Sequence, residues 1–289
     1  MLEKHGEREH AREGRRIRRL MNIAPGRAAG FALALLPFLL IAMVYVVSSA
    51  ERRAQNPNDK LLPPVAEMAD AVRRVAFEPD RRSGEFVLWT DTTASLGRLA
   101  LGLGIATLIG LALGLSIGVL PLVSAALAPL VAVLCMVPPM AMLPVLFIVF
   151  GLGELSKVVL IVIGVAPFLV RDLAFAAARL PVEQLVKAQT LGASTWQVAI
   201  RVVLPQIMPR LIEAVRLSLG PGFLFLISAE AIAAESGLGY RIFLVRRYLA
   251  MDVILPYVAW ITFLAYVMDL TLARLSRAAF PWAVIEERR

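Results

Sequence analysis

Long apolar runs separated by short polar segments dominate the chain. No charged side chain occurs from Leu99 to Gly153, a stretch long enough for two membrane crossings and a tight turn, at 96–120 and 122–150. A helix needs about 20 apolar residues to cross the hydrocarbon core of a bilayer. Four further runs are each long enough for one crossing: residues 28–50, 155–178, 211–234 and 253–272. The pattern predicts an all-α integral membrane protein with six transmembrane helices.

The polar segments between these runs predict how the chain is divided. Inside the second segment, apolar residues from Val65 to Val75 recur at helical spacing, which predicts a short amphipathic helix. Small residues at 48–50 leave removal of the first apolar run by cleavage open as an alternative. The expected parts are a basic tail at 1–27, a first transmembrane helix at 28–50, an external loop at 51–94, a core of five transmembrane helices at 95–275 and a tail at 276–289.

Composition and charge support a membrane protein and indicate its orientation. The chain has 289 residues, of which 59% are hydrophobic and 18% charged, and a soluble domain of this length would carry more charge. Much of the net charge of +8 lies in residues 1–27 and between apolar runs, as expected for cytoplasmic Lys and Arg rather than for binding of nucleic acid. We therefore expect both termini in the cytoplasm, although the basic residues of 51–94 favour the opposite orientation.

The residues that usually carry catalysis or bind metals are sparse. His5 and His10 lie in the polar tail and Cys135 lies in an apolar segment, so no metal site and no disulfide framework are expected. The nearest match to a phosphate-binding loop has Ser156 and Val158 where Gly and Ser or Thr belong. The sequence therefore predicts neither catalytic residues nor an ATP site of that kind.

The segment 181–209, PVEQLVKAQTLGASTWQVAIRVVLPQIMP, predicts a helical elbow between the fourth and fifth spans. A short helix at 182–191 is ended by Gly192, which adopts left-handed dihedrals at low cost. A second helix that begins near Ser194 runs to Pro205. Such an elbow can project as a rigid knob into a groove on a partner, and an ordinary amphipathic hairpin is the alternative.

This segment resembles the EAA loop of binding-protein-dependent ABC importer permeases. Their pattern is Glu-Ala-Ala, three spacers, Gly and, further on, Ile-x-Leu-Pro. Here Val186 replaces the acid, and we expect Glu183, one turn earlier, to supply the lost charge. The resemblance implies an ATPase-coupling role for Glu183, Val186, Lys187, Ala188, Gly192, Ala193, Val202, Leu204 and Pro205.

Two further segments resemble the nitrate, sulfonate, taurine and bicarbonate branch of these permeases. They are SLGRLALGLGIATLIGLALGLSIG at 95–118 and GLGYRI at 237–242. The resemblance implies a permease of the bacterial inner membrane that works with a second permease copy, two ABC ATPase subunits and an external substrate-binding protein. ATP and Mg would be bound by the ATPase, with no cofactor in this chain. The segments LLPP, LVRRYLAMDVILPYVAW and FPW resemble a subgroup associated with urea- or guanidine-type nitrogen compounds.

Small residues and prolines within the spans predict close packing and broken helices. Residues of this kind at every fourth position of the second span favour a close helix contact, either within one chain or between two copies: Ala106, Gly110, Gly114 and Gly118. Pro139 and its neighbours interrupt the third span, and Pro221 interrupts the fifth. Broken helices often line a translocation path, and simple kinking is the alternative.

Glu230 lies within an apolar run, where a carboxylate is costly unless it is paired, hydrated or neutral. Arg216 lies fourteen positions earlier, on nearly the same face of a straight helix. We expect both to face one path or gate, with a structural hydrogen bond from Glu230 as the alternative. A stand-alone secondary transporter or channel is the main rival function, although such proteins usually carry several intramembrane acids.

Overall fold

The computed structural model describes residues 26–57, 59–80 and 84–286, with side chains described as far as Ala283. The described secondary structure is helical throughout and contains no strand. Helix α1 (Arg27–Gln55) belongs to one compact unit, and the helices from Asp59 onward form a second unit. The predicted basic tail, apart from its last two residues, lies outside the described part of the chain.

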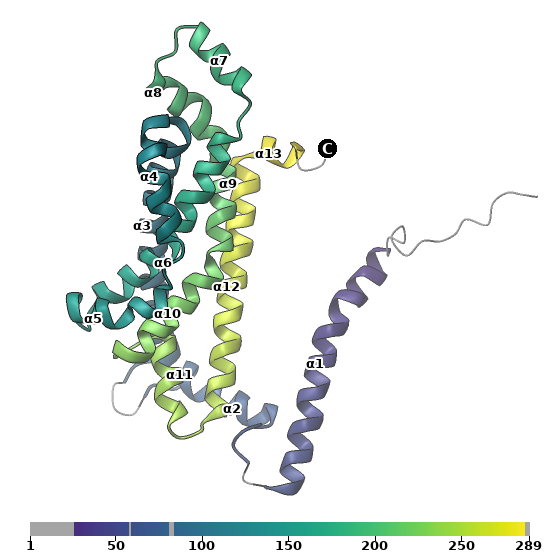
Figure 1. Cartoon of the computed structure of the whole chain (residues 1–289). Helices are drawn as coiled ribbons and strands as arrows, with labels where there is room; N and C mark the ends of the chain where they lie inside the picture. The colour runs from purple at the N-terminus through teal and green to yellow at the C-terminus, as the bar shows by residue number, and fades with distance from the viewer. Residues whose placement is uncertain (1–25, 58, 81–83, 287–289) are drawn as a thin grey trace, which may run out of the picture. The chain divides into compact units, whose positions relative to one another are not determined.

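The second unit is a bundle of long helices with short helices at both ends. In Figure 1, α7 and α8 lie at one end together with α13, and α2 and α11 lie at the other. Its α-helices are α2 (Val65–Phe77), α3 (Val87–Val119), α4 (Pro121–Leu134), α5 (Leu143–Phe150), α6 (Glu154–Ala178), α7 (Val182–Thr190), α8 (Thr195–Val198), α9 (Leu204–Leu217), α10 (Leu219–Ala233), α11 (Leu238–Arg246), α12 (Met251–Ala279) and α13 (Pro281–Glu286).

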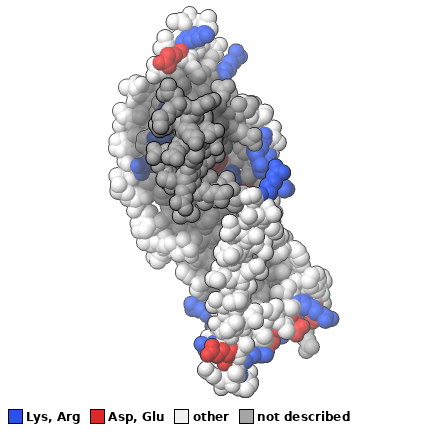
Figure 2. Space-filling model, turned by 90° about the vertical axis from the view of Figure 1, so that its right-hand side faces the viewer, with Lys and Arg blue, Asp and Glu red and all other residues white. Residues whose placement is uncertain are grey.

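Four described helices are long and apolar enough to cross a membrane, namely α1, α3, α6 and α12. Two bent helix pairs raise the number of possible crossings to six. Uncharged side chains cover most of the described surface in Figure 2. On α1, large apolar side chains are exposed, such as Phe31 at 70% and Phe38 at 73%. Such surfaces are stable in lipid, so the predicted all-α membrane class agrees with the structure.

The third span expected at 122–150 is a bent helix pair, broken where its prolines predict an interruption. Helix α4 ends at Leu134, and a 3-10 turn, Pro139–Met142, leads into α5 at a bend of 83°. Pro138 and Pro139 lack the N–H groups that would continue the α-helical hydrogen bonds. The chain therefore turns away at the point where the two prolines stand.

The helical stretch that contains the fifth predicted span, 211–234, is longer than that span and is bent. The helical stretch begins at Thr195 and bends by 42° at Ser218, between α9 and α10. Pro221 has no N–H to bond the carbonyl of Leu217, so the break falls one turn before the proline. The elbow's second helix does not end at Pro205 as expected, because a wide π turn at 199–203 precedes α9 and accommodates the proline ring.

The closest helix contact in the bundle joins α3 to α6. A Cβ added at Gly110, Gly114 or Gly118 would lie 2.4–2.7 Å from a Cβ of α6. Ala106, at the same spacing, is fully buried. Of the two alternatives for this stripe of small residues, the contacts match packing within one chain.

Candidate functional site

The elbow between α6 and α9 is a rigid reversal of the chain. Gly192 has φ +82°, a conformation that side chains other than glycine rarely adopt. The next helix, α8, begins with a capping box at Ser194. The backbone N–H of Gln197 donates to Ser194 Oγ at 3.3 Å, and the backbone N–H of Ser194 donates to Gln197 Oε1 at 2.8 Å. These local bonds fix the angle between α7 and α8.

The inner face of the elbow is packed against the ends of α3 and α6. Val198, Val203 and Ile207 are buried there with Ala177 of α6. Several partly buried side chains of the elbow join this cluster, namely Leu185, Ala188, Ala193 and Val202. Apolar burial therefore anchors the elbow to the bundle.

The outer face of the elbow exposes large apolar side chains. The exposed fraction is 65% for Val182, 81% for Leu191 and 72% for Trp196. An exposed apolar patch beside charged residues typically marks an interaction site. Leu191 and Trp196 were not predicted as site residues. The signal that could have found Trp196 is that it is a large apolar residue that does not belong to the buried inner face.

The predicted coupling residues divide between these two faces. Glu183, Val186 and Lys187 are exposed on α7, and Gly192 and Pro205 are also exposed. The other members are half-buried at the base of the elbow: Ala188, Ala193, Val202 and Leu204. The position of the motif acid, occupied by Val186, thus lies on the outer face.

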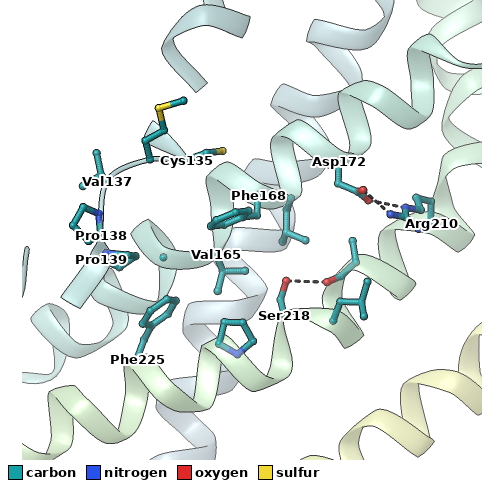
Figure 3. Close-up of a pocket in the computed structure, with 16 residues that line it drawn as sticks. Cys135, Val137, Pro138, Pro139, Val165, Phe168, Asp172, Arg210, Ser218 and Phe225 are labelled. Carbon is teal, nitrogen blue, oxygen red and sulfur yellow. Dashed lines mark hydrogen bonds and ion pairs between the residues drawn. The ribbon is translucent and has the colours of Figure 1, made fainter. Parts of the chain in front are cut away.

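A cavity of about 570 Å³ lies where the two bent helix pairs face α6 (Figure 3). Pro139 and Pro221, both predicted from the sequence, line it. Its wall is mainly apolar, with one ion pair, Asp172–Arg210, at the end toward the elbow. A space bounded by two helix breaks suits passage of a small solute.

Glu230 does not line this cavity but is fully buried in a hydrogen-bonded cluster. Ser95 Oγ donates to its carboxylate at 2.7 Å, Arg98 Nη1 at 2.6 Å and the Gly239 amide at 2.8 Å. A buried carboxylate is stable when its oxygens are paired in this way. The structural alternative for Glu230 thus matches these contacts, whereas a role in the path is not tested by them.

The same cluster extends outward through Arg98. Its guanidinium also bonds Glu154 and the Ser236 carbonyl, and Lys157 Nζ lies 2.8 Å from Glu154. Arg98 and Lys157 are buried, whereas the Glu154 side chain is 63% exposed. Every cation of the cluster therefore faces a carboxylate.

Asp91 of α3 forms a second centre of the cluster, where it bonds to the GLGYRI segment. It accepts bonds from the Gly237 amide at 2.9 Å, Arg241 Nε at 2.8 Å and Tyr257 Oη at 3.2 Å. Burial lowers the pKa of Arg241, but its bond to Asp91 outweighs this effect, so the pKa lies above its ordinary value. We name the whole group the ionic cluster: Asp91, Ser95, Arg98, Glu154, Lys157, Glu230 and Arg241. Of this cluster, only Glu230 was predicted from the sequence, although SLGR and GLGYRI contain three further members, Ser95, Arg98 and Arg241.

Arg216 lies apart from Glu230 and pairs with Asp269 of α12 at 2.9 Å and 3.0 Å. The expectation that Arg216 and Glu230 share a helix face assumed one straight helix. The bend at Ser218 makes that argument wrong, because the two residues lie on different helices. Among the described residues, no group of three His, Cys, Asp or Glu side chains is placed to hold a metal ion.

Apolar helices, two broken helix pairs around a cavity and a projecting elbow define a helical membrane transport protein. The family model of the binding-protein-dependent transport system inner membrane component matches residues 106–282, and the chain belongs to that family.

Several named proteins are similar to it. The taurine transport system permease protein TauC of Escherichia coli (strain K12) is 38% identical over 196 residues, covering 68% of this chain and 71% of TauC. The putative aliphatic sulfonates transport permease protein SsuC of the same organism is 30% identical over 146 residues, covering 50% and 56%. The nitrate import permease protein NrtB of Leptolyngbya laminosa is 28% identical over 155 residues, covering 54% and 56%.

The fold also resembles a solved structure, the inward-facing MetNI methionine ABC transporter. The TM-score is 0.59 at 21% identity, and the match covers 66% of this chain and 95% of that one. The chain is an ABC importer permease of the taurine, sulfonate and nitrate type, a multi-pass membrane protein whose relatives are permease subunits.

Proposed function

We propose that this chain lines the transport path of an ATP-driven importer for a small polar solute and receives movement from a separate ATPase through its elbow. Two permease copies, two ATPase subunits and an external binding protein make up the complex. ATP and Mg are bound by the ATPase. The solute is a nitrate-, sulfonate- or taurine-like anion or zwitterion, or a urea- or guanidine-like nitrogen compound.

The exposed apolar outer face of a rigidly anchored elbow is the observation that carries this proposal. Leu191 and Trp196 are exposed there while the inner face is buried. Water around such side chains is unfavourable, so a partner that covers them gains free energy. Because the capping box and the buried base fix the elbow, a push on its outer face passes to α6 and α9 rather than bending a loop.

The cavity and the polar face of α9 form the path in this proposal. Pro139 and Pro221 shape the cavity, and Arg216 borders a groove of about 610 Å³ nearer the elbow. Glu230 contributes as a gate residue from the far end, where it holds α3, α10 and α11 together. Lipid contacts the apolar helix surfaces, and the small-residue stripe of α3 keeps each copy compact.

The proposed topology has six crossings, with each bent helix pair counted as one. The elbow and the described C-terminal residues lie at the same end of the second unit, which supports placing both in the cytoplasm (Figure 1). The N-terminal tail then also lies in the cytoplasm, and the protein spans the bacterial inner membrane.

Capture of an ATPase by the solubilised chain tests the proposal. Wild type and the variants Trp196→Ala, Gly192→Pro and Glu183→Arg are purified with a candidate ABC ATPase. The variant Trp282→Ala serves as control, because Trp282 is exposed at 51% but lies outside the elbow. We expect the elbow variants to lose the ATPase and the control to keep it.

The rival function predicts a different result. If no ATPase binds to wild type and the chain alone moves solute in liposomes, the elbow is an ordinary hairpin and the chain is a stand-alone transporter. Size-exclusion profiles of each variant distinguish lost docking from misfolding.

A further inference from the structure

Arg210 lies between two open spaces of the bundle. It lines the cavity of about 570 Å³ and also the groove of about 610 Å³ formed by α9, α12 and α13. Figure 3 shows Arg210 and Asp172 at one end of the cavity, with Phe225 and the two prolines away from that end. The pair therefore stands where the two spaces would join.

The guanidinium of Arg210 has carboxylate partners on two different helices. Asp172 of α6 accepts two bonds, at 2.6 Å and 2.8 Å, and Glu213 of α9 accepts one at 2.8 Å. Glu213 moves with Arg210 because it lies three residues further along the same helix. Asp172 lies 38 positions earlier, on the other leg of the hairpin that carries the elbow.

The ion pair is not needed to hold the two legs together. Ala177 of α6 and Ile207 of α9, one on each leg, are already buried together in one apolar cluster. The side chains of Asp172 and Arg210, by contrast, are 31% and 41% exposed because they face the open spaces. An ion pair this exposed adds little to stability, so its position at the junction points to another role.

We propose that the Asp172–Arg210 ion pair is an inner gate between the cavity and the groove, and that Glu213 is the alternative partner that permits it to open. The proposal rests on the proposed function, since movement of the elbow supplies the force. When the legs separate, Arg210 leaves Asp172 and stays bonded to Glu213. The guanidinium never loses all its carboxylate partners, which keeps the cost of opening low.

The rate at which the native thiol is labelled reports whether the gate is open. Cys135 is the chain's one cysteine and lines the cavity. Inverted membrane vesicles that contain the permease with its ATPase are treated with a charged, membrane-impermeant maleimide, and the rate of labelling of the permease band is measured. Reagent from the cytoplasmic side reaches Cys135 through the groove only when the gate is open.

The two carboxylates should have opposite effects on this rate. Asp172→Asn removes the closed-state partner, so we expect labelling to rise roughly fivefold, the upper range for a partly exposed ion pair. Glu213 is one of two carboxylate partners of Arg210 in the closed state but the one that remains in the open state. Glu213→Gln therefore destabilises the open state more than the closed state, and labelling should fall about twofold. Asp172→Glu should keep the rate near wild type. Asp269→Asn is the matched control, because Asp269 pairs with Arg216 at the groove and does not line the cavity.

Equal rates in all variants, or shifts of the same sign for Asp172→Asn and Glu213→Gln, would overturn the gate. The Glu213→Gln variant retains the Asp172–Arg210 ion pair. Its labelling rate therefore tests the gate even if Asp172→Asn fails to assemble. ATPase capture measured on the same vesicles separates the two proposals. If the permease captures the ATPase but labelling is the same in all variants, the gate proposal alone is wrong. If wild type captures no ATPase, the proposed function is wrong.

Discussion

The two ends of the helical bundle differ in which kind of side chain is exposed and which is buried. At the elbow, apolar side chains such as Leu191 and Trp196 are exposed to water. At the other end, the charged side chains Asp91, Arg98 and Glu230 are buried and pair with one another. In the proposed function a partner covers the exposed apolar end, whereas the side chains of the buried ionic end pair within the chain. The difference agrees with the proposed function, in which the ionic cluster holds one end of the bundle together and the elbow receives the movement of the ATPase.

The largest expected effect is at the ionic cluster. Glu230→Ala leaves Arg98 without its inner carboxylate, and removal of one partner from a buried ion pair costs about 3–5 kcal/mol. We expect a large drop in the thermal unfolding midpoint in detergent. Glu235→Ala is the matched control, because Glu235 is exposed five residues further on. Equal midpoints for the two variants would show that the cluster does not fix the bundle.

Substitution of one glycine at each end of the bundle compares the cost of backbone strain at the two ends. Gly237 has φ +133°, and a Cβ there would lie 2.5 Å from the Glu230 carboxylate, so Gly237→Ala should cost roughly 2–3 kcal/mol. Gly192 has φ +82° with open space around it, so Gly192→Ala should cost about 1 kcal/mol. Chemical denaturation in mixed micelles measures both. A larger loss for Gly192→Ala would reverse the comparison.

The smallest effect on stability is expected at the elbow's outer face. Leu191→Ser removes a side chain that is 81% exposed, so the free energy of unfolding should change by less than about 0.5 kcal/mol. The same variant should weaken ATPase capture. Val203→Ser, which alters a buried side chain at the base of the elbow, should instead lower the unfolding midpoint. If Leu191→Ser unfolds the protein as readily, the outer face is part of the core and not a docking surface.

Features that depend on neighbouring residues could be predicted from the sequence. The positions of α3, α6 and α12 follow from their apolar runs, although α3 begins nine residues before its run and α12 ends seven residues after its run. The elbow reversal follows from Gly192, because few other residues adopt its dihedrals. The prolines predicted that the third and fifth spans are broken, but they did not predict the bend angles of 83° and 42°. Those angles depend on how the flanking helices pack, which single positions do not encode.

Pairings between distant residues could not be predicted. Arg98 and Glu230 are 132 positions apart, and nothing in either segment specifies the other. The expectation that Glu230 and Arg216 face one path treated a helix that bends at Ser218 as straight. Trp196 was overlooked for a related reason, since an exposed tryptophan is informative only once the buried face of its helix is known.

The π turn at 199–203 has a consequence for how such elbows can vary. Its amide at Leu204 bonds the carbonyl of Ala199, five residues back, so the turn contains one residue more than an α-helix would. Deleting one residue there would restore α-helical spacing and rotate the elbow by about 100° relative to α9. The cavity walls beyond Arg210 would keep their phase. One deletion at this turn would therefore point Leu191 and Trp196 in a new direction, and the buried side chains of Val198 and Val203 would have to repack.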